Sequence, residues 1–224
     1  MLIDEELAAE LPADPDAAVA LQLRLRSRVD PADPRPPGFE TVAGLDSAYD
    51  DEGHVVAAIV VLDAKTLEPV DTATAQGHTD FPYVPGLLAF RELPTTLEAL
   101  RRLDTTPDLL ICDGQGLAHP RRFGLACHLG LLTGLPTIGV AKTLWGRCGH
   151  LGPERGSTTD ITIDDEIVGR AVRTRTDVKP VYVSTGHRIT LDTACTATLA
   201  LTPRYRQPET TRRADHLCRT LLRG

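Results

Sequence analysis

Long apolar runs are absent from the sequence, since none reaches the 18 residues that a membrane-spanning helix requires. The first ten residues, MLIDEELAAE, hold four acidic residues and no basic one, which excludes the positively charged start of a secretory signal peptide. We therefore expect a cytoplasmic protein that does not contact a membrane.

Cysteine is scarce, and its spacing indicates neither a disulfide framework nor a complete metal site. Three of the five cysteines stand in apolar, strand- or helix-like surroundings, so we expect buried, reduced thiols. Cys148 and His150 would supply half of a zinc site, but no second pair of ligands accompanies them. The cysteines are odd in number and form no CxxC pair: Cys112, Cys127, Cys148, Cys195 and Cys218.

Basic residues are outnumbered, with 24 lysines and arginines against 31 acidic residues. The net charge of −7 argues against a general nucleic-acid-binding protein. The charge is uneven, however, because residues 114–153 contain four basic and no acidic residues, and residues 201–224 contain six arginines against two acids. Two positive stretches on an acidic body can bind a polyanion locally. For the C-terminal stretch, a solvated helix face is an equal alternative.

The pattern of apolar residues predicts an α/β protein, and 42% hydrophobic with 25% charged residues is typical of a soluble globular chain. Strands grouped early, followed by alternating strands and helices, indicate a mixed sheet with helices on its faces. We expect one domain over residues 1–224, with residues 1–38 forming an N-terminal helix and loop that pack on it. The predicted helices cover 14–29, 94–104, 121–133, 191–201 and 209–222, the strands 41–46, 55–63, 69–75, 108–113, 136–141 and 181–184, with a hairpin at 160–175 and a loop at 30–38.

Two of the apolar strands are predicted to end in an aspartate, VAGLD in Asp46 and LLICD in Asp113. In α/β proteins, functional groups gather outside the carboxyl ends of parallel strands. If these two strands are parallel neighbours, their carboxylates lie side by side and either share a proton or hold a cation. Oxygen ligands of this kind suit Mg²⁺ or Mn²⁺. A lone strand-end aspartate more often starts a turn, but the presence of two favours a metal site.

The stretch GQGLAHPRR follows Asp113 directly. Gly114 and Gly116 allow the backbone to approach a ligand closely, because they lack a Cβ atom. His119, Arg121 and Arg122 follow at once and are suited to phosphate contact.

The segment FPYVPGLLAFRE presents a tyrosine on a stiff loop. Pro82 and Pro85 fix φ, remove two backbone donors and disfavour the helical region for the residues before them. Tyr83 is therefore predicted to sit on a rigid, non-helical loop.

Two further charged residues are candidates for the same site. Glu92 follows the apolar run GLLAF and would be a third acid, although it could instead form a weak surface pair with Arg91. Lys142 ends the predicted strand TIGVAK, where it could neutralise a phosphate, orient an attacking water or stand as a plain strand-end charge.

Six segments, in their order along the chain, resemble the endonuclease V family: GLDSAY, FPYVPGLLAFRE, DGQGLAHPRRFGLACHLGLL, PTIGVAKTLWG, VSTGHRITLD and PETTRRAD. The resemblance covers residues from about 40 to 215. It implies a ribonuclease-H-like fold, with a central mixed β-sheet flanked by helices. It also implies a metal-dependent endonuclease of DNA repair that recognises hypoxanthine, as deoxyinosine in DNA or inosine in RNA. Such an enzyme hydrolyses the second phosphodiester bond on the 3′ side of that base.

By matching positions, the resemblance assigns Asp46, Glu92 and Asp113 to metal binding and catalysis, with His119 and Lys142 completing the catalytic site. The expected cofactor is Mg²⁺, with Mn²⁺ as a substitute, and the expected partner of the monomer is DNA containing deoxyinosine or RNA containing inosine. No role follows for Asp215 or His216, because the family varies at the end of this motif.

The resemblance also places Tyr83 on a wedge that separates the strands at the lesion. A rigid ring inserted in the stack offsets part of the cost of extruding a base. Further nucleic-acid contacts are expected from Pro82, Pro85, Arg91, Arg121 and Arg122. The extruded purine is expected in a pocket formed by Gly86, Leu88, Gly114, Gly116 and Gly139.

Three alternatives stay open. The same acids would serve a structure-selective or inosine-RNA-directed nuclease on the same fold. A non-catalytic binding module would be expected to have lost one of the three acids, and a small-molecule phosphatase would have no use for Tyr83. Since 21 of the 24 basic residues are arginine, a GC-rich bacterial genome is indicated, where repair of DNA is the favoured role.

Overall fold

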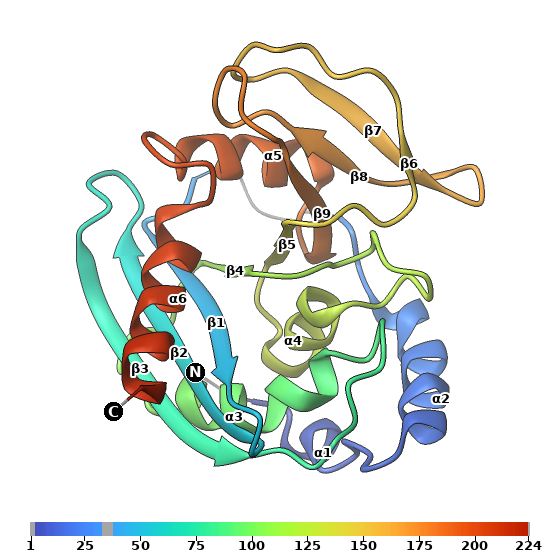
Figure 1. Ribbon diagram of the computed structural model, residues 1–224, viewed down its shortest axis with the longest axis vertical. Helices are drawn as coiled ribbons and strands as arrows, with labels where there is room; N and C mark the ends of the chain where they lie inside the picture. The colour runs from blue at the N-terminus through green and yellow to red at the C-terminus, as the bar shows by residue number, and fades with distance from the viewer. Residues whose placement is uncertain (1–2, 33–37, 224) are drawn as a thin grey trace.

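A mixed β-sheet forms the centre of the molecule (Figure 1). The computed structural model describes residues 3–32 and 38–223, and within them nine strands lie in the order β3-β2-β1-β4-β5-β9-β8-β7-β6. β4 pairs in parallel with β1 and with β5, and the other described pairs are antiparallel. The predicted mixed sheet is therefore confirmed. Its strands are β1 (Thr41–Tyr49), β2 (His54–Asp63), β3 (Pro69–His78), β4 (Leu109–Cys112), β5 (Thr137–Ala141), β6 (Arg147–Cys148), β7 (Thr158–Ile163), β8 (Glu166–Val172) and β9 (Val181–His187).

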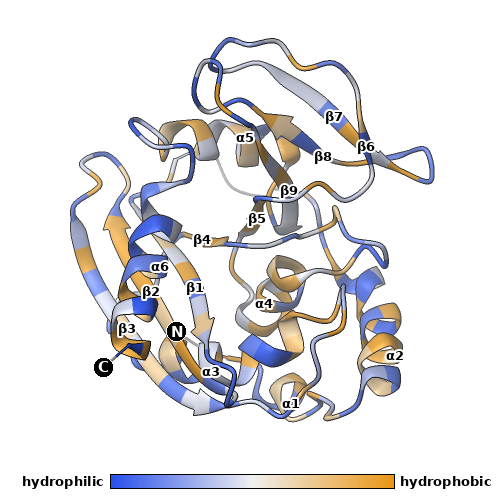
Figure 2. Cartoon of the chain, viewed as in Figure 1, coloured by the Kyte–Doolittle hydropathy of each residue, from blue (hydrophilic) through white to orange (hydrophobic). Residues whose placement is uncertain are grey.

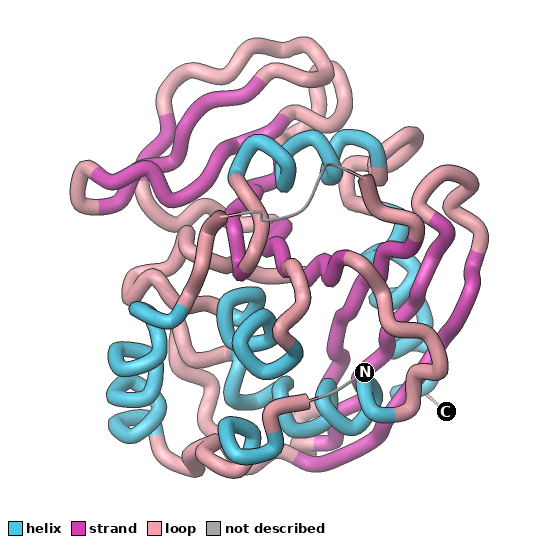
Figure 3. Tube along the Cα trace, turned by 180° about the vertical axis from the view of Figure 1, so that it is seen from behind, coloured by secondary structure: helices cyan, strands magenta, loops and turns pink. Residues whose placement is uncertain are grey.

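Helices cover both faces of this sheet, as the front and back views show (Figures 1 and 3). α3 packs on β2 and β3 and α4 on β5 and β9, whereas α5 and α6 belong to the core on the opposite face, where α6 crosses β1 and β2. No described helix is long and apolar enough to cross a membrane. The helices are α1 (Glu5–Ala8), α2 (Pro15–Leu25), the 3₁₀ turn η1 (Arg26–Arg28), α3 (Ala89–Arg101), α4 (Leu125–Thr133), α5 (Leu191–Ala200) and α6 (Glu209–Leu222).

Strand β2 shows why its sequence is apolar at almost every position. Ile59 and Val61 belong to the core beneath α3 and α4, whereas Val56 and Val60 belong to the core beneath α5 and α6. Alternate residues of a strand point to opposite faces, so a strand buried on both faces has no polar side. Figure 2 shows this as an apolar band through the middle of the sheet, with the hydrophilic colours outside.

Two predicted helix boundaries are wrong, each for a local reason. The helix predicted at 94–104 is α3, which begins at Ala89, because burial of its apolar face outweighs the one hydrogen bond that Pro94 cannot donate. The helix predicted at 121–133 is α4, which begins four residues later, because Arg122 has a φ of 56° and lies outside the helical region.

Strand β1 is predicted to end at Asp46 but continues to Tyr49, because it pairs with β2 as far as Val55. The short elements α1 and β6 are not predicted from the sequence. Residues 33–37 of the loop predicted at 30–38 lie outside the described residues.

The N-terminal helix α2 begins at Pro15, and the side chain of Asp14 accepts a hydrogen bond from the Ala17 amide at 2.9 Å, as its cap. Leu21 and Leu25 are buried in the same core as α3 and α4. The apolar residues of α2 thus pack the start of the chain against the face of the sheet that α3 covers.

All five cysteines are free, and four of them are buried, as the prediction of reduced core thiols requires. The exception is Cys148 in β6, which is exposed.

His128 is an unusual member of this core. It lies on α4 with no exposed surface, its ring 5.5 Å from that of Phe90 and 5.2 Å from that of Phe123. Neither of its ring nitrogens has a hydrogen-bond partner among the described residues. Burial lowers the pKa of His128 to about 3, because the charged ring would lose its hydration.

This histidine is expected to make the protein sensitive to acid. Between pH 6.5 and 3 the unfolded chain binds a proton at His128 that the folded chain does not, so stability falls as the pH falls through this window. At pH 5 the cost is about 2 kcal/mol. His128→Leu should flatten the profile between pH 7 and 5, measured by urea unfolding, whereas the exposed His150, changed to Gln, should leave it unchanged. Parallel profiles for His128→Leu and wild type would contradict this account.

Candidate active site

Three charged residues lie on or directly after three adjacent parallel strands, Asp46 within β1, Asp113 after β4 and Lys142 after β5. Leu45 of β1 pairs with Cys112 of β4, so Asp46 and Asp113 are the next residues along neighbouring strands. Lys142 directly follows β5, on the other side of β4, and its ammonium forms an ion pair with Asp113. The condition stated for the two aspartates, that their strands are parallel neighbours, is met.

Glu92 approaches these residues from helix α3. It lies in the first turn of the helix and is only 6% exposed. Burial, and then the negative charges of Asp46 and Asp113, raise the pKa of Glu92 well above its ordinary value. The three acids predicted from distant parts of the chain therefore line one cavity, although their carboxylate oxygens do not all lie within 4.8 Å of one another.

The neighbouring acids also change the pKa of Asp46. Burial and the neighbouring charge of Asp113 raise the pKa of Asp46 to about 8, against the opposing effects of the Ser47 amide, which donates at 2.9 Å, and of Lys142. Carboxylates held this close cannot all ionise unless positive charge is added among them. Burial opposes ionisation of Lys142 too, but Asp113, with Asp46 and Asp215, outweighs burial and raises the pKa of the ammonium.

A fourth acid, Asp215, reaches the site from α6. Its carboxyl group interacts with that of Asp46, and Arg219 donates from Nε to its Oδ1 at 2.6 Å. Burial would raise the pKa of Asp215, but Arg219, Asp46 and Lys142 together outweigh burial and lower it. α6 can approach β1 this closely at Gly44, where a Cβ atom would lie 2.2 Å from the carbonyl carbon of Thr210. A search for acids at strand ends cannot find an acid on a helix. The one sequence signal for Asp215 is its place at the end of the segment PETTRRAD.

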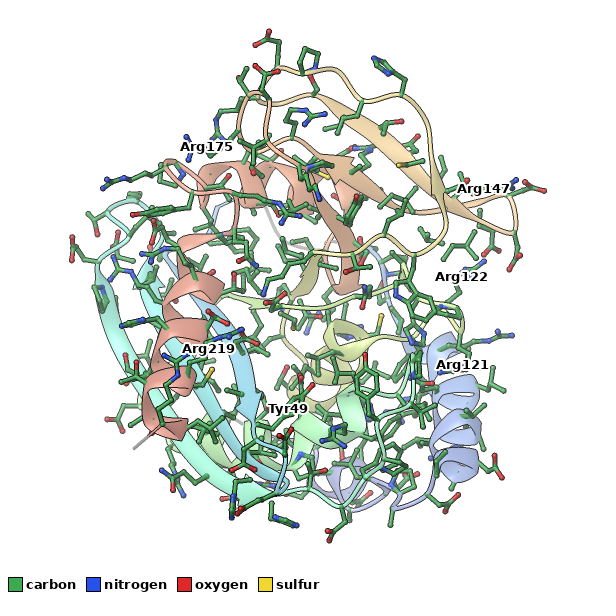
Figure 4. The ribbon with its side chains drawn as sticks, viewed as in Figure 1. Tyr49, Arg121, Arg122, Arg147, Arg175 and Arg219 are labelled. Atoms are coloured by element: carbon green, nitrogen blue, oxygen red, sulfur yellow. The ribbon has the colours of Figure 1, made fainter. Side chains whose placement is uncertain are left out.

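Asp46, Glu92 and Asp113 line a cavity of about 430 Å³, here called the carboxylate cavity. Tyr49, at the end of β1, and Arg219, on α6, both line it and are labelled in Figure 4. Burial, and then the charge of Glu92, raise the pKa of Tyr49. The lining consists of Asp46, Ser47, Ala48, Tyr49, Leu88, Glu92, Asp113, Arg219, Leu222 and Arg223.

A second acidic group, in the turn between β1 and β2, is engaged in holding that turn. Ligand atoms of Asp50, Glu52 and His54 lie within 4.8 Å of one another, the one such group that the described residues contain. Asp50 Oδ1 accepts from the amides of Glu52 and His54 at 2.9 and 3.0 Å, and His54 Nδ1 lies 2.8 Å from Asp50 Oδ2. Exposed Cys148 and His150 take no part in this group, so nothing in the described residues supports the half zinc site.

Residues 81–88, here called the tyrosine loop, hold Tyr83 out from the surface. Its side chain is 70% exposed and is flanked by the exposed Pro82 and Pro85. Gly86 closes the loop with a φ of +83°, a conformation that side-chain-bearing residues rarely adopt.

The tyrosine loop is anchored at its start by aromatic and cationic contacts. The buried ring of Phe81 stacks on Phe90 of α3 with centroids 5.6 Å apart. Arg91 donates to the carbonyl of Phe81 and lies 4.9 Å over the ring of Tyr49. Arg91, predicted as a nucleic-acid contact, therefore ties the loop to the end of β1.

A second cavity of about 250 Å³, the loop cavity, opens beneath Tyr83. It shares Leu88 and Asp113 with the carboxylate cavity, so the two adjoin. Gly86 and Gly114 of the predicted base pocket line it, together with the indole of Trp145.

Gly116 and Gly139 do not line either of these cavities, and here the structure corrects the predicted pocket. A Cβ atom at Gly116 would lie 2.1 Å from the carbonyl oxygen of Thr185, and one at Gly139 would lie 2.5 Å from the amide nitrogen of Gly116. Both glycines are needed because backbone segments pack directly against them.

His119 lies with the tyrosine loop in the loop cavity, away from the carboxylate lining. Its Nε2 donates to the carbonyl of Gly86 at 2.9 Å, its Nδ1 accepts from the amide of Arg121 at 3.2 Å, and its ring stacks on Trp145 at 5.8 Å. Burial lowers the pKa of His119 to about 4, so the ring is neutral at pH 7.

The two arginines after His119 also have protein partners. Arg121 donates to the carbonyl of Gly86 at 2.8 Å, and Arg122 donates to the carbonyl of Ile163 at 2.7 Å and to Glu166 at 3.0 Å. In Figure 4 both lie on the α2 side of the view, whereas Arg219 lies on the opposite side, on α6. Phosphate contact by either residue would compete with these bonds.

Carboxylates gathered on β1 and at the end of β4, on a mixed sheet with helices on both faces, are the features of a ribonuclease-H-like nuclease. The family model for Endonuclease V matches residues 23–216. The chain therefore belongs to the endonuclease V family and is an endonuclease. The resemblance and the fold expected from the sequence are both confirmed.

Individual relatives agree over nearly the whole chain. Endonuclease V of Nocardia farcinica is 65% identical over 215 residues, which are 96% of this chain and 95% of the relative. The crystal structure of Endonuclease V from Streptomyces avermitilis matches with a TM-score of 0.91 and 58% identity over 96% of each chain. Ciona intestinalis Endonuclease V, solved in complex with a 24mer DNA containing an inosine followed by a ribo-adenosine, matches with a TM-score of 0.79 and 30% identity over 91% of this chain and 95% of that one.

Proposed function

We propose that this endonuclease recognises hypoxanthine, as deoxyinosine or inosine, and hydrolyses the second phosphodiester bond on its 3′ side in a reaction that requires Mg²⁺, with Mn²⁺ as a substitute. One observation carries the proposal: the carboxylate cavity and the loop cavity adjoin at Leu88 and Asp113. A base held beneath Tyr83 would place its neighbouring phosphates at the acids. The inosine-containing DNA bound by the Ciona relative supports this substrate class.

The acids suit a divalent metal ion. Asp46, Asp113 and Glu92 would hold it, and Asp215 lies within hydrogen-bonding reach of Asp46. Their donors are all carboxylate oxygens, which are the ligands that Mg²⁺ and Mn²⁺ prefer. Burial, and then the neighbouring carboxylates, raise the pKa values of Asp46 and Glu92, and a bound cation would offset both effects. When bound, the metal ion supplies charge neutralisation at the phosphate and lowers the pKa of water.

The chain's own residues supply the remaining chemistry. The ammonium of Lys142, held beside Asp113, brings a fixed positive charge to the phosphate oxygens. Glu92 lines the same cavity, and its carboxylate form would take up a proton as water attacks. Leu88, in the wall between the two cavities, separates the base from the reacting phosphate.

Recognition rests on the tyrosine loop. Extruding a base leaves a gap in the stack, and unstacking costs a few kcal/mol. The ring of Tyr83 would fill that gap and offset part of the cost. Because two prolines already restrict the loop, little conformational entropy is lost on insertion.

We propose further that the N-terminal segment, residues 1–38, belongs to the same domain as the rest of the chain. The support is that Leu21 and Leu25 of α2 lie in the core beneath α3, and that Gln22 of the same helix lines the loop cavity. The endonuclease would act as a monomer in the cytoplasm.

The test is cleavage of a labelled duplex that contains one deoxyinosine. With Mg²⁺, a single nick is expected at the second phosphodiester on the 3′ side, with at least a roughly hundredfold preference over a duplex carrying deoxyguanosine. EDTA should abolish the nick. Cleavage of both duplexes alike would overturn the proposed specificity, and cleavage confined to branched or mismatched duplexes would identify a structure-selective nuclease.

The same pair of oligonucleotides made as RNA tests the alternative substrate. The Ciona ligand carries a ribonucleotide after its inosine, which favours including this arm. Faster cleavage of inosine RNA than of deoxyinosine DNA would assign the enzyme to RNA.

A further inference from the structure

The carbonyl oxygen of Gly86, at the end of the tyrosine loop, accepts three side-chain hydrogen bonds. The donors are Nε2 of Gln22 at 3.0 Å, Nε2 of His119 at 2.9 Å and a guanidinium nitrogen of Arg121 at 2.8 Å. A carbonyl oxygen has two lone pairs, so three donors saturate it. Residues from α2 and from the segment before α4 thus converge on one atom of the loop that presents Tyr83.

Gln22 is the member of this cluster that the sequence pattern did not single out. It is 1% exposed and lies on α2. Its Nε2 also donates to the carbonyl of Phe123 at 3.0 Å, and its Oε1 accepts from Nε of Arg121. Both partners of Nε2 can only accept and the partner of Oε1 can only donate, which determines the orientation of the amide.

The amide of Gln22 therefore organises one wall of the loop cavity. It fixes the Gly86 carbonyl directly and the guanidinium of Arg121 through Oε1, and Arg121 in turn bonds to the same carbonyl. Gln22, Gly86 and His119 all line the loop cavity, which adjoins the acids at Asp113.

We propose that Gln22 is a positioning residue for recognition of the lesion, holding the backbone from Gly86 to Leu88 in the form that receives the extruded base. This inference rests on the proposed function. Gln22 acts through Gly86 and lies outside the carboxylate cavity, so its loss should affect binding of the damaged strand more than the chemical step. A preorganised wall avoids an ordering cost on binding, and two buried hydrogen bonds to backbone carbonyls supply that order.

The main test is Gln22→Met, which keeps the length and volume of the side chain but can donate no hydrogen bond. We expect KM for a deoxyinosine duplex to rise about tenfold, kcat to change less than about twofold, and the preference over a deoxyadenosine duplex to fall about tenfold. Gln22→Glu keeps the partner of Arg121 but places acceptors against two carbonyls, so it should show the same shift in KM. Either variant suffices if the other does not fold.

Thr198→Val is the matched control for general destabilisation. Thr198 is fully buried in α5, on the opposite face of the sheet, and its hydroxyl donates to the carbonyl of Ala194 at 2.8 Å. This variant also loses a buried hydrogen bond, but it should leave KM and base preference at the wild-type values. An unchanged KM and base preference in the Gln22 variants would overturn the proposal, as would an equal change in Thr198→Val.

Trp145 offers a readout that needs no substrate. It is the only tryptophan of the chain, it lines the loop cavity, and it stacks on His119, which shares the Gly86 carbonyl with Gln22. Quenching of its fluorescence by acrylamide should increase about twofold in Gln22→Met and stay unchanged in Thr198→Val. If wild type does not cleave deoxyinosine DNA, the proposed function fails while this measurement still reports whether Gln22 orders the cavity. Unchanged quenching would overturn the positioning role itself.

Discussion

Replacing Asp46 by asparagine is expected to lower the rate of cleavage by at least roughly a thousandfold while stabilising the metal-free protein. A metal ion at this site is worth several kcal/mol of transition-state stabilisation, and about 4 kcal/mol corresponds to a thousandfold. Asparagine retains an oxygen that can accept from the Ser47 amide, but it removes the charge that repels Asp113. Binding of deoxyinosine DNA should stay close to wild type, because the loop cavity is untouched.

The stability that Asp46→Asn gains over wild type depends on pH, and the raised pKa of Asp46 determines the direction of that dependence. The pKa of Asp46 is about 8 in the folded protein and near 3.8 when unfolded, so wild type loses stability as the pH rises through this window. Asp46→Asn escapes that loss, which is roughly 2–4 kcal/mol at pH 7. The corresponding rise in melting temperature is about 4–10 °C, measurable by calorimetry in EDTA. Added Mg²⁺ should raise the melting temperature of wild type more than that of the variant.

Asp50→Asn is the matched control for this variant. Asp50 is an exposed acid four residues further along, in the group that holds the turn after β1. Its asparagine variant keeps the acceptor of that turn and should retain wild-type cleavage. Wild-type turnover by Asp46→Asn, or loss of activity in Asp50→Asn alone, would move the metal site from the carboxylate cavity to this turn.

Tyr83→Ala is expected to weaken binding of deoxyinosine DNA about ten- to a hundredfold and to reduce the preference for it over undamaged DNA. Stacking of a base on an aromatic ring is worth about 1–3 kcal/mol, which sets this range. Because the side chain is 70% exposed, its removal should change the free energy of unfolding by less than about 0.5 kcal/mol. Lost affinity, measured by fluorescence anisotropy, can then be attributed to the ring itself.

Tyr83→Phe separates the ring from its hydroxyl group. The phenylalanine variant keeps the stacking surface and should bind the damaged duplex as tightly as wild type. Both variants should retain the Mg²⁺-dependent rise in melting temperature, since neither touches the acids. Equal affinity of Tyr83→Ala and wild type would rule out the wedge.

Most of the site could be predicted from local patterns. Asp46 and Asp113 follow apolar runs that could only be buried strands, and parallel pairing of β1 with β4 then brings them together. Lys142 follows the third such strand. The stiffness of the loop around Tyr83 is a property of proline itself and needs no tertiary contact.

Other parts depended on packing between segments far apart in the chain. Asp215 lies beside Asp46 because α6 packs closely against β1 at Gly44. In the sequence, an acid on an amphipathic helix that faces solvent cannot be distinguished from one that contacts another part of the protein. Asp215 is a site residue that the sequence pattern missed, whereas Gly139 is one that it wrongly placed in the pocket. A glycine on a strand suggests room for a ligand, but the loop around Gly116 fills that room.

The sequence by itself determined the apolar strands, the stiff tyrosine loop and the acids at Asp46 and Asp113, because strand periodicity, proline geometry and side-chain chemistry act over a few neighbouring residues. The tertiary structure alone decided that Asp215 joins those acids and that Gln22 and Arg121 hold the carbonyl of Gly86. Hydrogen bonds such as that between Gln22 and Phe123, 101 positions apart, form only when burial of the apolar cores has packed distant segments on the sheet, and no local pattern encodes that contact.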